Sequence, residues 1–353
     1  MRIALVASAR FPIKEPFAGG LEAHTWTLAR TLTQRGHQVE LFAGPGTDPT
    51  LDVRELPVRR ARLSESARSD VSMPDGQWMD EHHAYLRLML DLAGSDGRRF
   101  DVVHNNSLHY LPIAMAAALP RPVVTTLHTP PTPWLESAIQ TSERCPVVFT
   151  AVSAHTARVW RPLVPAARVV RNGIDTALWS RGPGGPGLAW FGRVVPEKGP
   201  HLAIEAARLA GVPLRLAGPV GDTEYFRERV APLLDDTITY AGHLDHRGLV
   251  DFVGHAAAVL VTPCWDEPYG LVVAESLACG TPVCGFDRGA LGEILTPECG
   301  RLAPADDVAA LAELIPETMR LDRLAARDRA ERFCSLDAMA DRYVSLYEEL
   351  AAR

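Results

Sequence analysis

Short runs of Val, Ile, Leu and Ala recur along the whole chain, and longer segments with a helical spacing of apolar residues separate them. In the first half of the chain, the expected strands cover residues 3–7, 39–43, 102–104, 123–127, 147–152 and 168–170. In the second half, they cover residues 188–191, 214–217, 238–240, 259–262 and 283–286. Apolar strands that alternate with helices form a parallel sheet, because helices on both faces bury each strand on both sides. The pattern therefore predicts an α/β fold.

A stretch rich in glycine and proline, residues 181–187, separates the two series of strands. Such a stretch cannot form the interior of a helix or strand, so it indicates a connection between domains. The chain has 353 residues, which is more than one hydrophobic core usually organises. We predict two Rossmann-like domains, residues 1–174 and 175–336, whose parallel sheets face an interdomain cleft. A C-terminal helix at about 337–353 is expected to pack back on the first domain. Ligands of open α/β sheets bind beyond the carboxyl ends of the strands, which places the site in the cleft.

Charge and composition exclude several classes of protein. The net charge of −7 argues against non-specific binding to nucleic acid, which needs a basic surface. No run of 18 apolar residues occurs, so no membrane-spanning helix is expected. We interpret residues 1–7 as a buried strand and not as a signal peptide, which predicts a cytoplasmic protein. None of the six cysteines has redox-motif or zinc-ligand spacing, so reduced thiols are expected. They are Cys145, Cys264, Cys279, Cys284, Cys299 and Cys334.

The strongest chemical signal follows the expected strand 259–262. After this strand the sequence continues with an acid, Glu267, and a glycine, Gly270. A helix that ends before Gly280 and a Thr-Pro pair then lead into the next strand. The N-terminus of a helix favours phosphate through its free N–H groups and its dipole, and Gly270 lets a ligand approach the backbone there. Glu275, more than one turn inside the helix, suits the vicinal hydroxyls of a ribose, because a carboxylate accepts two hydrogen bonds. Glu267 precedes the helix, beside the expected position of a phosphate-linked sugar.

These residues resemble the E-x7-E signature of retaining GT-B glycosyltransferases of the glycogen synthase-like family 4, and the resemblance covers nearly the whole chain. It implies the GT-B fold, with an N-terminal acceptor domain and a C-terminal donor domain. It also implies that Glu275 binds the donor ribose and that Glu267 is a catalytic residue in contact with the sugar. The backbone at Gly270, Leu271 and Val272 would then meet the phosphate and the ribose.

A second signal is the segment Phe-Gly-Arg-Val-Val-Pro-Glu-Lys-Gly at residues 191–199, which follows another expected strand. It resembles the family's Gly-Arg…Glu-Lys-Gly segment, whose two cations hold the donor pyrophosphate. Arg193 and Lys198 are therefore expected to bind the donor and to act in catalysis, because they neutralise charge on the leaving group. Apart from Lys198, the only lysine is Lys14. This scarcity favours a dedicated phosphate contact for Lys198 over a solvated loop charge.

Two further positions complete the expected site. Gly19 and Gly20, between the first strand and the first helix, permit a tight turn close to a phosphate, and they match the family's first-loop glycine pair. Some relatives have a lysine two residues before that pair, whereas Lys14 is five before it. His128 ends an expected strand and resembles the family's active-site histidine, which contacts the donor sugar. A structural histidine is the alternative for that position.

The sequence contains no Asp-x-Asp motif. We therefore expect neither a metal nor another cofactor, with Arg193 and Lys198 supplying the positive charge. The resemblance implies retention through same-face attack, in which the departing phosphate assists deprotonation of the acceptor. His128 and Glu267 are expected to orient the nucleotide-sugar donor, for which a UDP-sugar is favoured over GDP- and ADP-sugars. The acceptor, whether a small molecule, a glycan or lipid-linked, and the oligomeric state stay open.

Three other functions compete with this interpretation. A hydrolase needs two carboxylates that flank a sugar, but Glu267 and Glu275 are better placed along a nucleotide. A nucleotide-sugar 2-epimerase of the same architecture would release free nucleotide and need no acceptor. A non-catalytic nucleotide-sugar-binding subunit would serve a partner enzyme, although the intact set of Arg193, Lys198 and His128 favours a catalyst.

Residues 54–83 have no clear period and are rich in arginine. The arginines are Arg54, Arg59, Arg60, Arg62 and Arg68. A solvated excursion followed by the start of a helix is favoured over a mobile loop that contacts an anionic acceptor. Peripheral membrane contact through these arginines would need a second anchor. A metal site at His82 and His83 is disfavoured, because adjacent side chains point apart on a helix.

Overall fold

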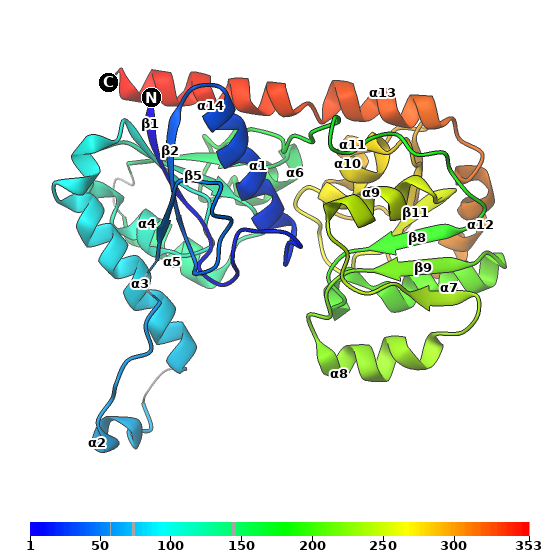
Figure 1. Ribbon diagram of the computed structural model, residues 1–353, viewed down its shortest axis with the longest axis horizontal. Coiled ribbons are helices and arrows are strands. Elements are labelled where there is room, and N and C mark those ends of the chain that lie inside the picture. Colours follow the sequence, from blue (N-terminus) through cyan, green and yellow to red (C-terminus); the bar gives the residue numbers. More distant parts are fainter. Residues whose placement is uncertain (57, 73–74, 143–145, 353) are drawn as a thin grey trace.

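The structure is a computed structural model that describes residues 1–56, 58–72, 75–142 and 146–352. Two α/β domains lie side by side, and each is built around one parallel sheet (Figure 1). The predicted fold class, two Rossmann-like domains with parallel sheets, is confirmed. The strand order in both sheets runs outward from the first strand in two directions, which is the arrangement that creates a crevice at the carboxyl edge.

The N-terminal sheet has the order β3-β2-β1-β4-β5-β6-β7. Its strands are β1 (Arg2–Val6), β2 (Gln38–Ala43), β3 (Val53–Glu55), β4 (Val102–Asn105), β5 (Val123–Leu127), β6 (Val147–Ala151) and β7 (Arg168–Val169). Its helices are α1 (Gly20–Gln34), α2 (Glu65–Arg68), α3 (Gly76–Ala93), α4 (Leu111–Ala114), α5 (Pro133–Thr141) and α6 (Ala154–Trp160), with short 3₁₀ turns η1 (Asp96–Arg99) and η2 (Ala116–Ala118). Strand β3 was not predicted. It is a three-residue edge strand with two exposed side chains, so it lacks the apolar run that marks the others.

The C-terminal sheet has the order β10-β9-β8-β11-β12-β13. Its strands are β8 (Leu188–Phe191), β9 (Leu214–Ala217), β10 (Ile238–Tyr240), β11 (Ala258–Val261), β12 (Val283–Phe286) and β13 (Gly300–Ala303). Its helices are α7 (Pro200–Ala210), α8 (Thr223–Tyr225), α9 (His246–Gly254), α10 (Leu271–Ala278), α11 (Leu291–Ile294), α12 (Val308–Thr318) and α13 (Arg323–Phe333), with short helical turns η3 (Pro196–Lys198), η4 (Phe226–Val230) and η5 (Ala231–Leu233). Strand β13, at the edge of this sheet opposite β10, was also not predicted.

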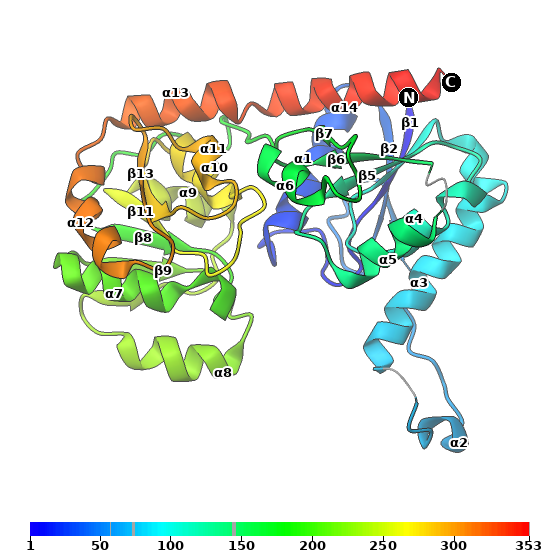
Figure 2. The same ribbon diagram turned by 180° about the vertical axis from the view of Figure 1, so that it is seen from behind.

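The last helix, α14 (Leu336–Ala351), leaves the C-terminal domain and runs along the N-terminal domain beside β1 and α1 (Figures 1 and 2). Its apolar face joins the core around β1. Two tyrosines of this face reach buried polar groups of the N-terminal sheet. The hydroxyl of Tyr343 lies 3.0 Å from Oγ1 of Thr126, and the hydroxyl of Tyr347 lies 2.6 Å from Nδ1 of His104. Because buried polar atoms need partners, these contacts fix the helix on this domain.

The arginine-rich segment forms an arm. Helix α2 and the first turns of α3 project away from the N-terminal domain (Figures 1 and 2). Most described residues of the arm are exposed. At its base, Arg54 pairs with Asp96 at 2.7 Å, so this arginine belongs to the domain surface. Among the described residues, no helix has the length and apolar character needed to cross a bilayer.

The cysteines of the described residues are free thiols. Cys279, Cys284, Cys299 and Cys334 are buried, and Cys264 is exposed. Burial raises the pKa of Cys279 to about 12, which keeps that thiol protonated. Cys145 lies outside the described residues.

Candidate active site

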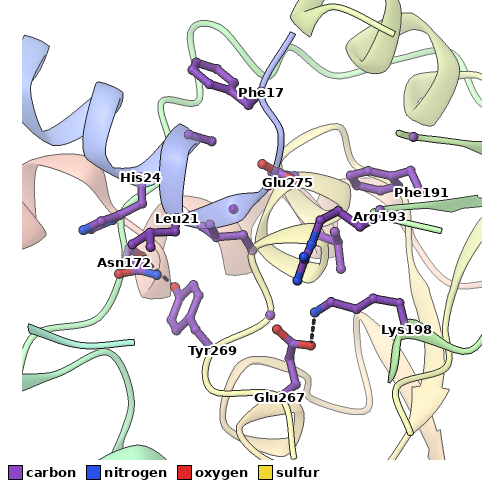
Figure 3. Close-up of a pocket in the computed structure, with 18 of the residues that line it drawn as sticks. Phe17, Leu21, His24, Asn172, Phe191, Arg193, Lys198, Glu267, Tyr269 and Glu275 are labelled. Atoms are coloured by element: carbon purple, nitrogen blue, oxygen red, sulfur yellow. Dashed lines mark hydrogen bonds and ion pairs between the residues drawn. The ribbon is translucent and has the colours of Figure 1, made fainter. Parts of the chain in front are cut away.

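The cleft between the domains holds a cavity of about 330 Å³. Its lining comes from segments that follow β1, β5, β8 and β11, so the carboxyl ends of both sheets open into the same space. Figure 3 shows Arg193 and Lys198 extending into this space from one side and His24 lying on the other. All ten residues predicted for the site line the cavity. They are Gly19, Gly20, His128, Arg193, Lys198, Glu267, Gly270, Leu271, Val272 and Glu275.

Lys198 and Glu267 form an ion pair in the cavity wall. Nζ of Lys198 lies 2.5 Å from Oε2 of Glu267, and both side chains are largely shielded from water (Figure 3). The indole N–H of Trp265 donates to the same carboxylate oxygen at 3.1 Å, and the ammonium lies 5.1 Å from the indole centroid. A pair between two rigid loops in a shielded site keeps its geometry better than a surface pair does. It fixes one positive and one negative group side by side.

The loop that carries Glu267 is held by a glycine that the sequence analysis missed. Gly289 has a left-handed backbone, with φ of 63°, and a Cβ there would lie 2.2 Å from the carbonyl oxygen of Glu267. The next residue, Ala290, donates its N–H to that carbonyl at 2.8 Å. Any side chain at residue 289 would therefore push Glu267 out of position. No pattern of residue types in the sequence marks this backbone contact.

The expected phosphate-binding helix is present as α10. Gly270 precedes it with φ of 96°, a conformation that glycine adopts without strain. The first N–H groups of a helix have no acceptor within the helix, so the amides of Leu271 and Val272 are available to an anion in the cavity. The positive end of the helix dipole adds to the field of Lys198 at the same place.

Glu275 lies one turn further along α10 and also lines the cavity. Burial raises the pKa of its carboxyl to about 8. The group is therefore mostly protonated near pH 7, because desolvation penalises the ionised form. A protonated carboxyl can both donate and accept a hydrogen bond, so it binds hydroxyl groups as well as a carboxylate does. Because it is uncharged, it also does not repel a diphosphate.

Gly19 and Gly20 allow the two domains to approach closely. A Cβ on Gly20 would lie 3.0 Å from Cδ1 of Leu271, and one on Gly19 would lie 3.7 Å from Nε of Arg193. Within the described part of the chain, the one carboxylate paired with Arg193 is that of Glu197, at the long distance of 3.8 Å. Its guanidinium therefore keeps most of its hydrogen-bonding capacity for a ligand.

Glu22, on the first turn of α1, is a buried acid that the sequence analysis did not select. Burial raises its pKa, and the charges of Arg193 and Arg10 act in the opposite direction. The carboxylate thus lies within the field of the cation expected to bind the donor, although the two residues belong to different domains.

His128 follows β5 and is hydrogen-bonded to Asn106, with 2.6 Å between Nε2 and Oδ1. Its ring lies edge-on to His24, with the centroids 5.2 Å apart. Burial, together with the nearby His24 and His104, holds the pKa of His128 well below its ordinary range. The imidazole is therefore neutral near pH 7, and it can exchange hydrogen bonds with a sugar but does not add positive charge.

His24 was also missed by the sequence analysis. Its side chain is 3% exposed and lines the cavity, and within the part of the chain that the structure describes neither ring nitrogen has a hydrogen-bond partner. Burial lowers its pKa to about 4, so it too is neutral. An unpaired buried imidazole is costly unless a ligand or water completes it. The helical spacing of α1 places it on the cleft face, but a histidine among apolar positions gives no separate signal.

Contacts between the domains support the loop that contains Glu267. The hydroxyls of Ser153 and Thr156 donate to the carbonyl of Pro268 at 2.6 and 3.0 Å. The hydroxyl of Tyr269 donates to the carbonyl of Asn172 at 2.6 Å (Figure 3). The Glu293 carboxylate accepts the N–H groups of Ala154 and His155 at the start of α6, at 3.0 and 2.5 Å.

The arrangement is suited to a ligand that is anionic at one end and rich in hydroxyls at the other. Two cations and a helix N-terminus converge on one part of the cavity beside the Glu267 carboxylate, and the rest of the lining combines apolar side chains with polar groups such as His128 and Asn172. Among the described residues, no three His, Cys, Asp or Glu side chains gather in a way that could hold a metal ion.

Two family models match the two domains. Residues 18–178 match the family described as Glycosyltransferase Family 4, and residues 184–332 match Glycosyl transferases group 1. The glycogen synthase of Mycobacterium tuberculosis (strain CDC 1551 / Oshkosh) is 30% identical over 372 residues, which cover 94% of this chain and 88% of the relative.

Solved structures share the whole fold. The glycosyltransferase AviGT4, involved in avilamycin A biosynthesis, superposes with a TM-score of 0.72 at 24% identity and covers 99% of this chain and 98% of its own. Anabaena HepE in complex with UDP-glucose superposes with a TM-score of 0.76 at 19% identity, over 99% of this chain and all of its own. At these identities the likeness establishes the shared architecture alone.

Proposed function

Because this chain belongs to glycosyltransferase family 4, we propose that it transfers a sugar from a UDP-sugar to an acceptor, with retention at the anomeric carbon and without a metal ion. The observation that carries the proposal is the Lys198–Glu267 pair, which lies near the N-terminus of α10 on the same side of the cavity as Arg193 (Figure 3). One part of this site is built for a diphosphate, and an acid and a histidine stand where the attached sugar would lie.

The donor would lie along the wall of the cavity that the C-terminal domain forms. Its diphosphate would contact Arg193, Lys198 and the amides of Leu271 and Val272, and Gly20 leaves room for it. Lys198, held by its pair with Glu267, and the two backbone amides are in place before the ligand arrives, so they stabilise the charge that grows on the leaving group at little cost in reorganisation. The ribose hydroxyls would pair with Glu275 at the cavity wall.

The sugar would lie between His128 and Glu267. As the bond between the anomeric carbon and the phosphate oxygen breaks, positive charge develops on the sugar ring, and the Glu267 carboxylate stabilises it. The acceptor oxygen attacks the same face that the phosphate leaves. Its proton passes to the departing phosphate oxygen, so no protein base is needed. Neutral His128 would orient a sugar hydroxyl without repelling the developing cation.

UDP is favoured as the nucleotide because HepE, which shares the fold, was crystallised with UDP-glucose. We also propose a cytoplasmic location, since the free thiols of the described residues suit a reducing compartment. Contact of the arginine-rich arm with a membrane surface stays a prediction, to be checked by sedimentation with anionic vesicles.

The test is nucleotide release from UDP-, GDP- and ADP-sugars, each with EDTA and with magnesium, in the presence of a broad acceptor panel. We expect one UDP-sugar to be consumed at equal rates in both conditions, and NMR of the product to show the donor's anomeric configuration. Strict dependence on magnesium would contradict metal independence, and an inverted product would contradict retention. Nucleotide release with isomerisation of the sugar and no acceptor would instead indicate an epimerase.

A further inference from the structure

Outside the donor site, a column of four aromatic rings runs from the core of the N-terminal domain to its surface. It starts at Tyr85, which is 2% exposed and whose hydroxyl donates to the carbonyl of Ala7 at 2.8 Å. His109 stacks on Tyr85 with centroids 4.1 Å apart, Tyr110 stacks on His109 at 4.9 Å, and Trp134 stacks on Tyr110 at 5.3 Å. The interplanar angles are 15°, 21° and 22°, so the rings are nearly parallel.

A second pair of rings supports the outer end of this column. Trp78 and His82 of α3 stack at 5.2 Å, and Trp78 also contacts Trp134 at 5.6 Å. Nδ1 of His82 lies 3.1 Å from the hydroxyl of Tyr110. We call Trp78, His82, His109, Tyr110 and Trp134 the aromatic ledge. Helices α3 and α5, which carry its outer members, lie close together at one end of the domain (Figure 2).

The ledge ends on an open surface. Trp134 is 53% exposed, although it is anchored through the column to a buried tyrosine. A column that only filled the core would end on a covered ring, since leaving an indole in water forgoes the gain from burial. A rigid, exposed indole is instead the form in which aromatic side chains bind the apolar face of another ring.

The ledge adjoins the lining of the reaction cavity along the chain. Leu108, which directly precedes His109, is 43% exposed and lines the cavity. Thr129 lines it too, next to His128, and its buried hydroxyl oxygen has no partner within the described residues. Residues next to the ledge in the chain therefore line the same cavity as His128.

The ledge carries no formal charge near pH 7. Burial lowers the pKa of His109 to about 4, with a contribution from His82, and burial together with His83 lowers the pKa of His82. No lysine or arginine belongs to the ledge. The five ledge side chains therefore offer no cation to a phosphate or carboxylate, whereas to a ring with C–H faces and hydroxyl edges they offer aromatic faces together with imidazole and phenol groups.

We propose that the aromatic ledge is the acceptor subsite of this enzyme and that it stacks an uncharged sugar ring, so that the acceptor is a neutral saccharide or carries one. The inference rests on the proposed function, because it assigns the partner of the donor site. The exposed face of Trp134 would hold the ring, and the next unit would extend past Leu108 towards His128.

The test is saturation-transfer NMR of the whole chain, saturated with UDP, against neutral disaccharides built from glucose, mannose, galactose and N-acetylglucosamine. We compare the wild type with Trp134→Ala and Trp134→Phe, and with Leu209→Ala as an exposed apolar control on the other domain. Loss of one stacked ring should raise the Kd of the bound saccharide about five- to tenfold in Trp134→Ala. Trp134→Phe should keep most of the affinity, and Leu209→Ala all of it.

Binding of UDP is measured first on every variant. If the wild type does not bind UDP, the proposed function is wrong, and the assignment of the ledge as its acceptor subsite is wrong with it. If UDP binds but no disaccharide does, or if Trp134→Ala binds saccharide as the wild type does, the ledge inference alone is wrong. Preferential binding of myo-inositol 1-phosphate, included as a charged ring, would also overturn it.

Discussion

The two walls of the cleft bind by different physical means. The C-terminal wall presents charge, with Arg193, Lys198 and the N-terminus of α10 arranged around Glu267. The N-terminal wall presents neutral imidazoles, His24 and His128, whose pKa values are both depressed by burial. The charged wall fits the part of the reaction that is the same for every acceptor, the departure of a nucleoside diphosphate. The neutral wall fits the part that differs between enzymes of one fold, the choice of acceptor.

The largest effect that would sharpen this comparison is expected from Lys198→Ala. The variant removes a cation from the diphosphate site and leaves Glu267 without its partner, so kcat for nucleotide release should fall by at least about 100-fold. The matched control is Lys14→Ala, the only other lysine, which is exposed and does not line the cavity. The charge assignment is wrong if Lys198→Ala keeps more than half of the wild-type rate.

The next effect concerns the contacts that hold the two domains together. Glu293→Ala removes the carboxylate that accepts two N–H groups at the start of α6, across the domain boundary. We expect the free energy of unfolding to fall by about 1–3 kcal/mol, since two charge-assisted hydrogen bonds are lost.

Denaturant titration followed by tryptophan fluorescence measures this loss. Glu313→Ala, at an exposed position of α12, is the control and should leave stability within about 0.5 kcal/mol of the wild type. Equal stability of the two variants would show that the Glu293 contact does not hold the domains together.

The third effect is a pH dependence of stability that comes from Glu275. Its pKa rises from 4.5 to about 8 on folding, so between these values the folded chain holds a proton that the unfolded chain has lost. Stability from this group is therefore fully present below about pH 4.5, falls as the pH rises, and levels off above about pH 8. Glu275→Gln removes the dependence.

The melting temperature of Glu275→Gln should exceed that of the wild type by an amount that grows from about pH 5 to about pH 8 and then stays constant. Differential scanning calorimetry across this range measures it, with Glu313→Gln as the control. A difference that does not change with pH would contradict a buried, protonated Glu275.

The fold was predictable because most strands are buried on both faces. Nearly every residue of such a strand is apolar, which makes the strand visible in the sequence as a continuous apolar run. The edge strands β3 and β13 lack that signal, since each has one neighbour and partly exposed side chains. The donor wall was predictable for a related reason. A strand, a turn and a helix N-terminus follow each other in the chain, so Lys198, Glu267 and Glu275 appear in short motifs.

The aromatic ledge, His24 and Gly289 were not predictable from the sequence. Trp78, Tyr110 and Trp134 come from three separate segments, and only the packing of α3 against the loop after β4 and the start of α5 brings them together. His24 belongs to an amphipathic helix in which cleft-facing and core-facing positions share one spacing. Gly289 supports Glu267 through a close backbone contact, which no pattern of residue types records.

Calorimetric titration with UDP in EDTA, and again in magnesium, tests the central claim that the C-terminal wall binds a nucleoside diphosphate through protein cations. We predict the same Kd for the wild type in both buffers, and a Kd at least about tenfold higher for Lys198→Ala, the difference that a lost charge-assisted contact of about 1.4 kcal/mol produces. Binding of UDP only when magnesium is present, or no binding in either buffer, would contradict the account.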